Sequence, residues 1–152
     1  PKSIHNDNWE IAGCPVNGPR VDAQGDNLAV AWFASPKENS KVLVSFSKDA
    51  GETFQKPTKV DLGNPMGRVD LALIDDKTAI ASWLEGEKIL ARKVSSNGMM
   101  GKVITISQTS KSRASGFPQM EQFDGKLYFA WTMVDENRNS SIQLGVIKSS
   151  QF

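Results

Sequence analysis

The sequence predicts an all-β protein, a β-propeller segment made of three four-stranded antiparallel blades. A short apolar segment ending in Trp and one further residue occurs three times: Trp83 follows Trp32 by 51 residues, and Trp131 follows Trp83 by 48. Short β-branched and aromatic stretches alternate with Gly, Asp and Asn turns, and the sequence has no amphipathic helical period. Four short strands in each repeat of about 40–50 residues are typical of propeller blades.

Each Trp segment is expected to be the second strand of a hairpin whose first strand opens with glycine. The intervening dipeptides, Gly25-Asp26, Asp75-Asp76 and Asp124-Gly125, favour tight turns. The expected first strands cover residues 18–22, 67–71 and 116–120, and the expected Trp strands cover residues 28–33, 79–84 and 127–132.

Third and fourth strands complete the predicted blades. Third strands are expected over 41–47, 88–94 and 141–148, and fourth strands near 58–62 and 102–107. The chain then divides into residues 1–17, with an orphan outer strand over 8–12 and a leading loop; blades over 18–66 and 67–115; and a blade over 116–152 without its fourth strand.

Three blades are too few to close a ring, because closed propellers typically have about 4–8. An open stack would leave blade faces and strand edges uncovered. We therefore expect half of a six-bladed propeller, completed by a second copy or by a missing half. The orphan strand around Trp9 would then complete the final blade of the other half.

Composition narrows the function classes. The chain has 18 Lys and Arg against 17 Asp and Glu, a net charge of +1, so we expect no nucleic-acid partner. No apolar run reaches the roughly 18–20 residues of a membrane span. With one cysteine, Cys14, and one histidine, His5, the sequence predicts no internal disulfide, no metal and no cofactor.

A turn motif lies between the third and fourth strands of the first blade. Residues 47–54 read Ser-Lys-Asp-Ala-Gly-Glu-Thr-Phe. In such a turn Asp49 can accept backbone N–H groups, Gly51 can take a positive φ, and Phe54 can pack beneath. Ser47, Asp49, Gly51, Thr53 and Phe54 resemble the Asp-box, or BNR repeat, of sialidase-like propellers, where this turn is structural. The second blade has only a partial counterpart, Ser-Ser-Asn-Gly at 95–98.

This resemblance implies a protein that binds or hydrolyses a carbohydrate or another anionic small ligand. If it is an enzyme, it would be a sialidase-like glycoside hydrolase. Many Asp-box proteins are exported, so the resemblance also implies a secreted or periplasmic location. The alternative is a non-catalytic propeller that serves as a scaffold for protein–protein interaction, since the fold does not fix the function.

Three arginines are expected on one rim of the propeller, in the loops that precede the first strand of each blade. They are Arg20, Arg68 and Arg113. Sialidases clamp a substrate carboxylate with an arginine triad on such a rim, a task suited to the guanidinium fork. The competing interpretation is that Arg20 pairs with Asp22, and Arg68 with Asp70, as simple ion pairs.

The resemblance also implies a Tyr nucleophile activated by Glu and an acidic proton donor. Tyr128, the only tyrosine, is a weak nucleophile candidate because packing between blades is its alternative role. Asp22 and Asp70 are candidates for the proton donor, since each lies two residues after a rim arginine and so on the same side of its strand. Cys14 is either a half-buried thiol or a reactive thiolate near an arginine, and His5 could add only a weak two-ligand metal site.

Overall fold

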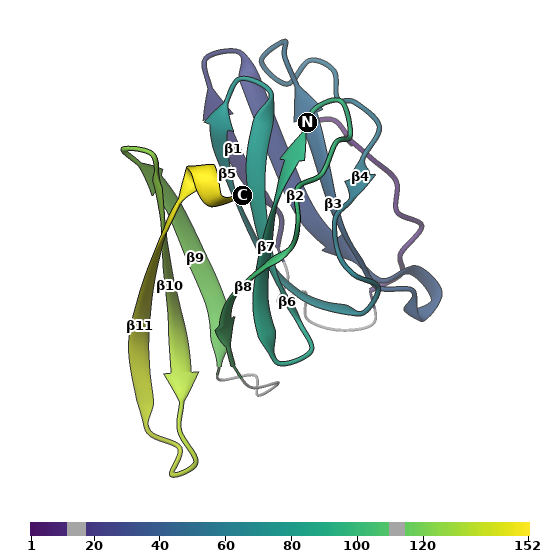
Figure 1. The fold of residues 1–152 in the computed structure, drawn as a ribbon. Coiled ribbons are helices and arrows are strands. Elements are labelled where there is room, and N and C mark those ends of the chain that lie inside the picture. Colours follow the sequence, from purple (N-terminus) through teal and green to yellow (C-terminus); the bar gives the residue numbers. More distant parts are fainter. Residues whose placement is uncertain (12–17, 110–114) are drawn as a thin grey trace.

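The computed structural model describes residues 1–11, 18–109 and 115–152, and its sheets form three blades side by side (Figure 1). The strands of each blade follow one another in sequence order across the sheet. Blade 1 contains β1 (Arg20–Gln24), β2 (Asn27–Ala34), β3 (Lys41–Ser47) and β4 (Thr58–Lys59). Blade 2 contains β5 (Pro65–Asp75), β6 (Thr78–Glu85), β7 (Lys88–Ser95) and β8 (Ile104–Gln108). Blade 3 contains β9 (Gly116–Phe123), β10 (Lys126–Val134) and β11 (Ser140–Lys148), and two short 3₁₀ turns are η1 (Pro36–Glu38) and η2 (Ser149–Gln151).

The all-β propeller architecture predicted from the sequence is confirmed, with local differences at strand ends. β4 is shorter than expected because Asp61 turns the chain: its carboxylate accepts the N–H of Val42 at 2.7 Å and that of Gly63 at 2.9 Å. The described part of the expected orphan strand, residues 8–11, is not a strand. Its Trp9 packs on Phe33 of β2, with the rings edge to face.

Each blade is closed by the same backbone hydrogen bond. A residue just after the third strand donates its N–H to the carbonyl of the turn between the first two strands. The three bonds are Ala50 to Asp26 at 2.9 Å, Ser96 to Lys77 at 2.8 Å and Ser149 to Gly125 at 2.9 Å. The structural repeat is therefore present in all three blades.

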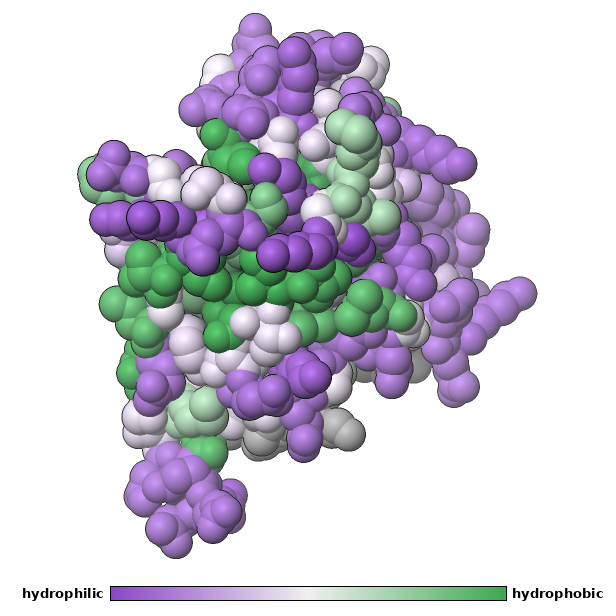
Figure 2. All heavy atoms as spheres, viewed as in Figure 1, coloured by the Kyte–Doolittle hydropathy of each residue, from purple (hydrophilic) through white to green (hydrophobic). Residues whose placement is uncertain are grey.

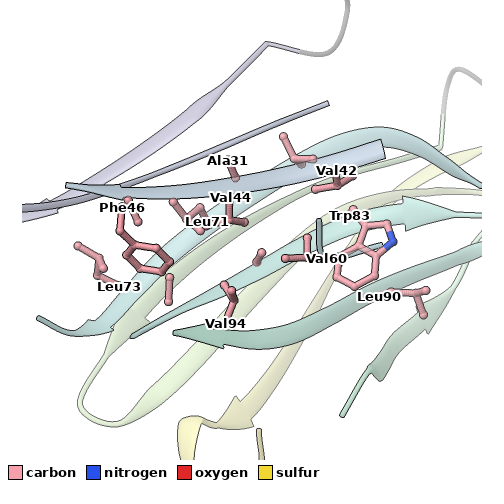
Figure 3. Packing of buried hydrophobic residues seen from close by; sticks show 14 residues of the cluster. Ala31, Val42, Val44, Phe46, Val60, Leu71, Leu73, Trp83, Leu90 and Val94 are labelled. Carbon is pink, nitrogen blue, oxygen red and sulfur yellow. The ribbon is translucent and has the colours of Figure 1, made fainter. Parts of the chain in front are cut away.

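The seam between blades 1 and 2, called the first seam, is the main core of the protein. Blade 1 contributes small and branched side chains from β2 and β3, including Ala31 and Val44. Blade 2 contributes a larger set that includes Trp83, and this side chain is fully buried in the cluster (Figure 3). The indole N–H of Trp83 donates to Glu85 at 2.8 Å, so the buried ring keeps a hydrogen bond.

The second seam joins blades 2 and 3. Ile80, Leu84 and Ile89 of blade 2 pack against Leu127 and Phe129 of blade 3, and all five are fully buried. The two seams together order the first strands of the blades, β1, β5 and β9, beside one another. Those strands begin at the site described below.

The two outermost blade faces differ in their cover. The outer face of blade 1, with Trp32 and Leu43, lies under the N-terminal segment, residues 1–11. Blade 3 has exposed hydrophobic residues on β11, and Figure 2 shows hydrophobic atoms reaching the surface in a band across the middle of the molecule. No helix in the described ranges is long and apolar enough to cross a membrane.

Candidate functional site: a pocket at the start of three blades

A pocket of about 160 Å³ lies where the first strands of the three blades begin. We call it the rim pocket. Its lining combines arginine, amide and apolar groups from successive blades. The lining residues are Gly18, Pro19, Arg20, Arg68, Val69, Phe117, Pro118 and Gln119.

Arg68 reaches from blade 2 to blade 3. Its Nη1 donates to the carbonyl of Ser115, and its guanidinium lies over the Phe117 ring, 4.3 Å from the centroid. This stacking is a cation–π contact. A Cβ at position 116 would lie 2.8 Å from the same guanidinium, so Gly116 leaves the room that Arg68 needs.

Arg68 and Phe117 share an unusual backbone conformation. Both have φ in the left-handed region, 54° and 55°, and both follow a glycine with positive φ, Gly67 and Gly116. Such conformations are costly for residues with a side chain and concentrate at functional sites. Here they re-aim two side chains into one pocket at the start of β5 and of β9.

Arg20 makes its contacts across blades. Its Nη2 donates to Oε1 of Gln119 at 3.3 Å, and its Nε lies 3.8 Å from Oδ1 of Asp70. The Arg20–Asp22 ion pair expected as an alternative is therefore wrong, because Arg20 bridges blades 1, 2 and 3. Asp22 instead accepts the N–H of Leu73 at 2.7 Å from blade 2.

The pairing register explains this arrangement. Arg20, Asp70 and Gln119 each lie opposite the residue that precedes the repeat Trp in its own blade. These three residues therefore occupy equivalent positions in their blades. Arg68 lies two residues before Asp70, in the part of β5 where the pairing with β6 is irregular. The expectation that Arg20 and Arg68 stand at matching places is thus corrected, although both reach the same pocket.

Asp70 is a buried link between blades 2 and 3. Its Oδ2 accepts the N–H of Met120 at 2.6 Å, and its Oδ1 accepts that of Leu71 at 2.9 Å. Burial raises the pKa of Asp70, although these two hydrogen bonds and the Arg20 charge act in the opposite direction. Asp22 makes a similar link from blade 1 to blade 2, two positions further along its strand. Both candidates for the proton donor, Asp22 and Asp70, therefore accept hydrogen bonds from backbone N–H groups.

The other candidates lie outside the rim pocket or outside the described residues. Tyr128 is half-buried on β10, on the face of blade 3 that points away from blade 2, where it pairs in register with Glu121. Arg113 and Cys14 lie outside the described residues. His5 lies near Trp32, with ring centroids 5.8 Å apart and the rings tilted, and the described ranges hold no cluster of metal-binding side chains.

The turn after β3 has the contacts expected from its residues. Asp49 accepts the Thr53 N–H at 2.8 Å and the Thr53 hydroxyl at 2.5 Å, and Ser47 donates to Asp49 at 2.7 Å. These hydrogen bonds lower the pKa of Asp49 to about 2. Gly51 has a φ of 83°, and Phe54 packs against the outer cluster of blade 1. The turn shares no lining residue with the rim pocket.

Sequence reasoning missed Phe117 and Gln119 as pocket residues. The signal for Phe117 was the Gly-Phe pair at 116–117, which repeats the Gly-Arg pair at 67–68. The position of Gln119 follows only from the pairing register of β9 with β10, which could not be inferred from the sequence.

Comparison with known proteins gives a fold and not a family. No protein-family model and no curated protein matches the sequence. Among solved structures, the chain is similar to the family-43 glycoside hydrolase BlXynB of Bacillus licheniformis, with a TM-score of 0.58, 12% identity, and coverage of 84% of this chain and 27% of that one. Xylan β-1,4-xylosidase of Bacillus halodurans C-125 gives a TM-score of 0.57 at 11% identity, and the match covers 85% of this chain and 27% of that one. A thermostable family-43 glycoside hydrolase gives 0.51 at 15% identity, covering 84% and 49%.

The chain has a β-propeller fold that is similar to part of the fold of family-43 glycoside hydrolases. It spans from about a quarter to half of the length of these structures. Family-43 glycoside hydrolases are five-bladed propellers, and none of the three structures just named is a sialidase. The comparisons thus support a propeller fold and leave the sialidase resemblance to the single turn that carries it.

Proposed function

We propose that this propeller binds the carboxylate of an acidic carbohydrate in the rim pocket. One observation carries the proposal: Arg20 and Arg68, from successive blades, line one pocket beside the apolar wall of Phe117. Guanidinium groups suit a carboxylate because their N–H groups form a planar fork. An apolar wall beside charged donors is typical of small-ligand sites. The likeness to glycoside hydrolases supports a carbohydrate as the ligand class.

The size of the pocket limits what it can hold. Sites for whole drug-sized ligands measure roughly 300–1,000 Å³, and the rim pocket has about 160 Å³. It therefore suits one charged terminal group of a larger glycan. Gln119 adds an amide beside Arg20 for hydroxyl groups next to the carboxylate.

The sialidase resemblance enters this proposal as a mode of binding, a carboxylate held by rim arginines. Asp22 and Asp70 each accept backbone N–H groups from the next blade, and Tyr128 lies on another face of blade 3. We therefore propose binding, with any glycosidase activity dependent on residues outside this chain segment.

A titration of the chain with glucuronate and with glucose tests the proposal, because the two sugars differ in the carboxylate. We expect glucuronate to bind and glucose to bind far more weakly, with N-acetylneuraminate as a second acidic probe. Arg20→Ala should weaken glucuronate binding by about 10- to 100-fold, the effect of losing a charge-assisted hydrogen bond.

Arg138→Ala is the matched control, since Arg138 is exposed in the hairpin between β10 and β11 and does not line the pocket. Equal affinity for both sugars would refute the carboxylate-binding proposal. So would an Arg20→Ala variant that keeps its fold and its affinity for glucuronate.

A further inference from the structure

Blade 3 carries one uncovered apolar face, which we call the open face. Ile142, Leu144 and Val146 lie on one side of β11, and their exposed fractions are 74%, 69% and 50%. Tyr128 and Ala130 lie on the same side of the neighbouring strand β10. Soluble proteins seldom expose a contiguous apolar patch of this kind unless it serves as an interface.

The strand register aligns this face with a buried face of blade 1. Leu144 pairs with the residue that precedes the repeat Trp of its blade, and Val44 does the same in blade 1. The same register makes Ile142 equivalent to Val42, Leu144 to Val44 and Val146 to Phe46.

In blade 1 these positions are closed by the next blade. Val42, Val44 and Phe46 are only 0%, 0% and 5% exposed because blade 2 packs on them. The covering surface of blade 2 is its tryptophan face, with Trp83 and Leu90. The open face of blade 3 therefore has the residue pattern of a blade face that receives another tryptophan face.

Blade 1 carries a tryptophan face that no blade covers. Trp32 pairs with Leu43 as Trp83 pairs with Leu90, and both residues of blade 1 lie on its outer side. The N-terminal segment covers this side mainly through three residues: Trp9 packs on Phe33, His5 lies near Trp32, and Asp7 pairs with Lys41. Asp7 accepts the indole N–H of Trp32 at 2.7 Å. Nine of the eleven residues in the segment are exposed, and no strand of the sheet includes them.

We propose that the open face of blade 3 docks on the Trp32 face of a second copy of this chain, with the N-terminal segment moving aside. The contact joins two different surfaces, so it can be made twice between two protomers and closes a two-fold ring. Two copies give six blades. That is one more than in family-43 glycoside hydrolases and lies within the range of closed propellers, about 4–8.

Sedimentation equilibrium of the full chain over a range of concentrations tests this assembly. One protomer has a mass of 16.6 kDa, and we expect a species of twice that mass. Leu144→Glu places a charge in the centre of the contact and should weaken association at least about 30-fold. Gln143→Glu is the matched control, one residue away on the other side of β11, and should leave association unchanged.

A third variant tests the role of the N-terminal segment. Asp7→Ala removes the hydrogen bond to Trp32 and should strengthen association by up to about tenfold, because the segment then competes less well. A folded chain that stays monomeric at the highest concentration would overturn the proposal, and a separate protein or further blades of a longer chain would then be the occupant. Equal weakening by Leu144→Glu and Gln143→Glu, or weaker association of Asp7→Ala, would also overturn it. Sugar binding in the rim pocket is measured separately and does not depend on this result.

Discussion

The two seams are built to one pattern but differ in how they are held. In the first seam a large apolar cluster encloses Trp83, and the linking carboxylate of Asp22 is only partly buried. In the second seam the linking carboxylate, Asp70, is buried, and Arg68 adds a contact to the Phe117 ring. Apolar burial therefore dominates the first seam, whereas the second seam also depends on polar groups that form the rim pocket.

The largest expected effect comes from the two seam tryptophans. Trp83→Ala should lower the free energy of unfolding by about 3–5 kcal/mol, because it empties a fully buried site in the first seam. Trp131→Ala in blade 3 should cost less: its indole N–H has no hydrogen-bond partner among the described residues, so no such bond is lost. Denaturant unfolding measures both, with the exposed Val21→Ala as control. Equal losses would remove the proposed difference between the seams.

A smaller effect is expected from the linking carboxylates. Asp70→Ala leaves the buried N–H of Met120 unpaired and should cost about 1–3 kcal/mol. Asp22→Ala should cost less, because water can reach its partly exposed site. Unfolding of the two variants under the same conditions makes the comparison, and a larger loss from Asp22→Ala would contradict it.

The Asp70 effect also has a predicted pH dependence. The pKa of Asp70 is raised above 3.8 in the folded protein, so ionisation opposes folding. Its contribution to stability is fully present below pH 3.8 and declines as the pH rises through the folded pKa. The difference in stability between the wild-type protein and Asp70→Ala should therefore shrink as the pH rises through that window.

The smallest effect is expected at the turn after β3, which lies outside both seams. Asp49→Ala should lower the melting temperature slightly at neutral pH, because the hydrogen bonds to Thr53 are lost. The pKa of Asp49 falls from 3.8 to about 2, so this stabilisation is present above pH 3.8 and is lost as the pH falls through about 2. Asn97→Ala in the corresponding turn of blade 2 is the control and should show no such pH dependence. Loss of glucuronate binding by Asp49→Ala at an unchanged melting temperature would contradict a structural role.

The fold was predictable because its signals are local. The tryptophan spacing, the strand alternation and the dipeptide turns mark the hairpins of all three blades. The rim pocket was only partly predictable. Arg20 and Arg68 were placed on one rim by sequence, but the irregular start of β5 shifts their registers by two residues. Such a shift depends on backbone conformations at Gly67 and Arg68 that no residue pattern specifies on its own.

The closing bond inside each blade has a consequence for how the chain folds. Ala50 and Asp26 are 24 residues apart, whereas the seam link from Leu73 to Asp22 spans 51. Loops that join distant residues cost more entropy and form more slowly. During synthesis each blade can therefore fold soon after its own residues emerge. Its apolar face stays exposed to solvent until the next blade has folded against it. The yield of folded protein then depends most on how long a folded blade exposes its apolar face before the next blade packs on it.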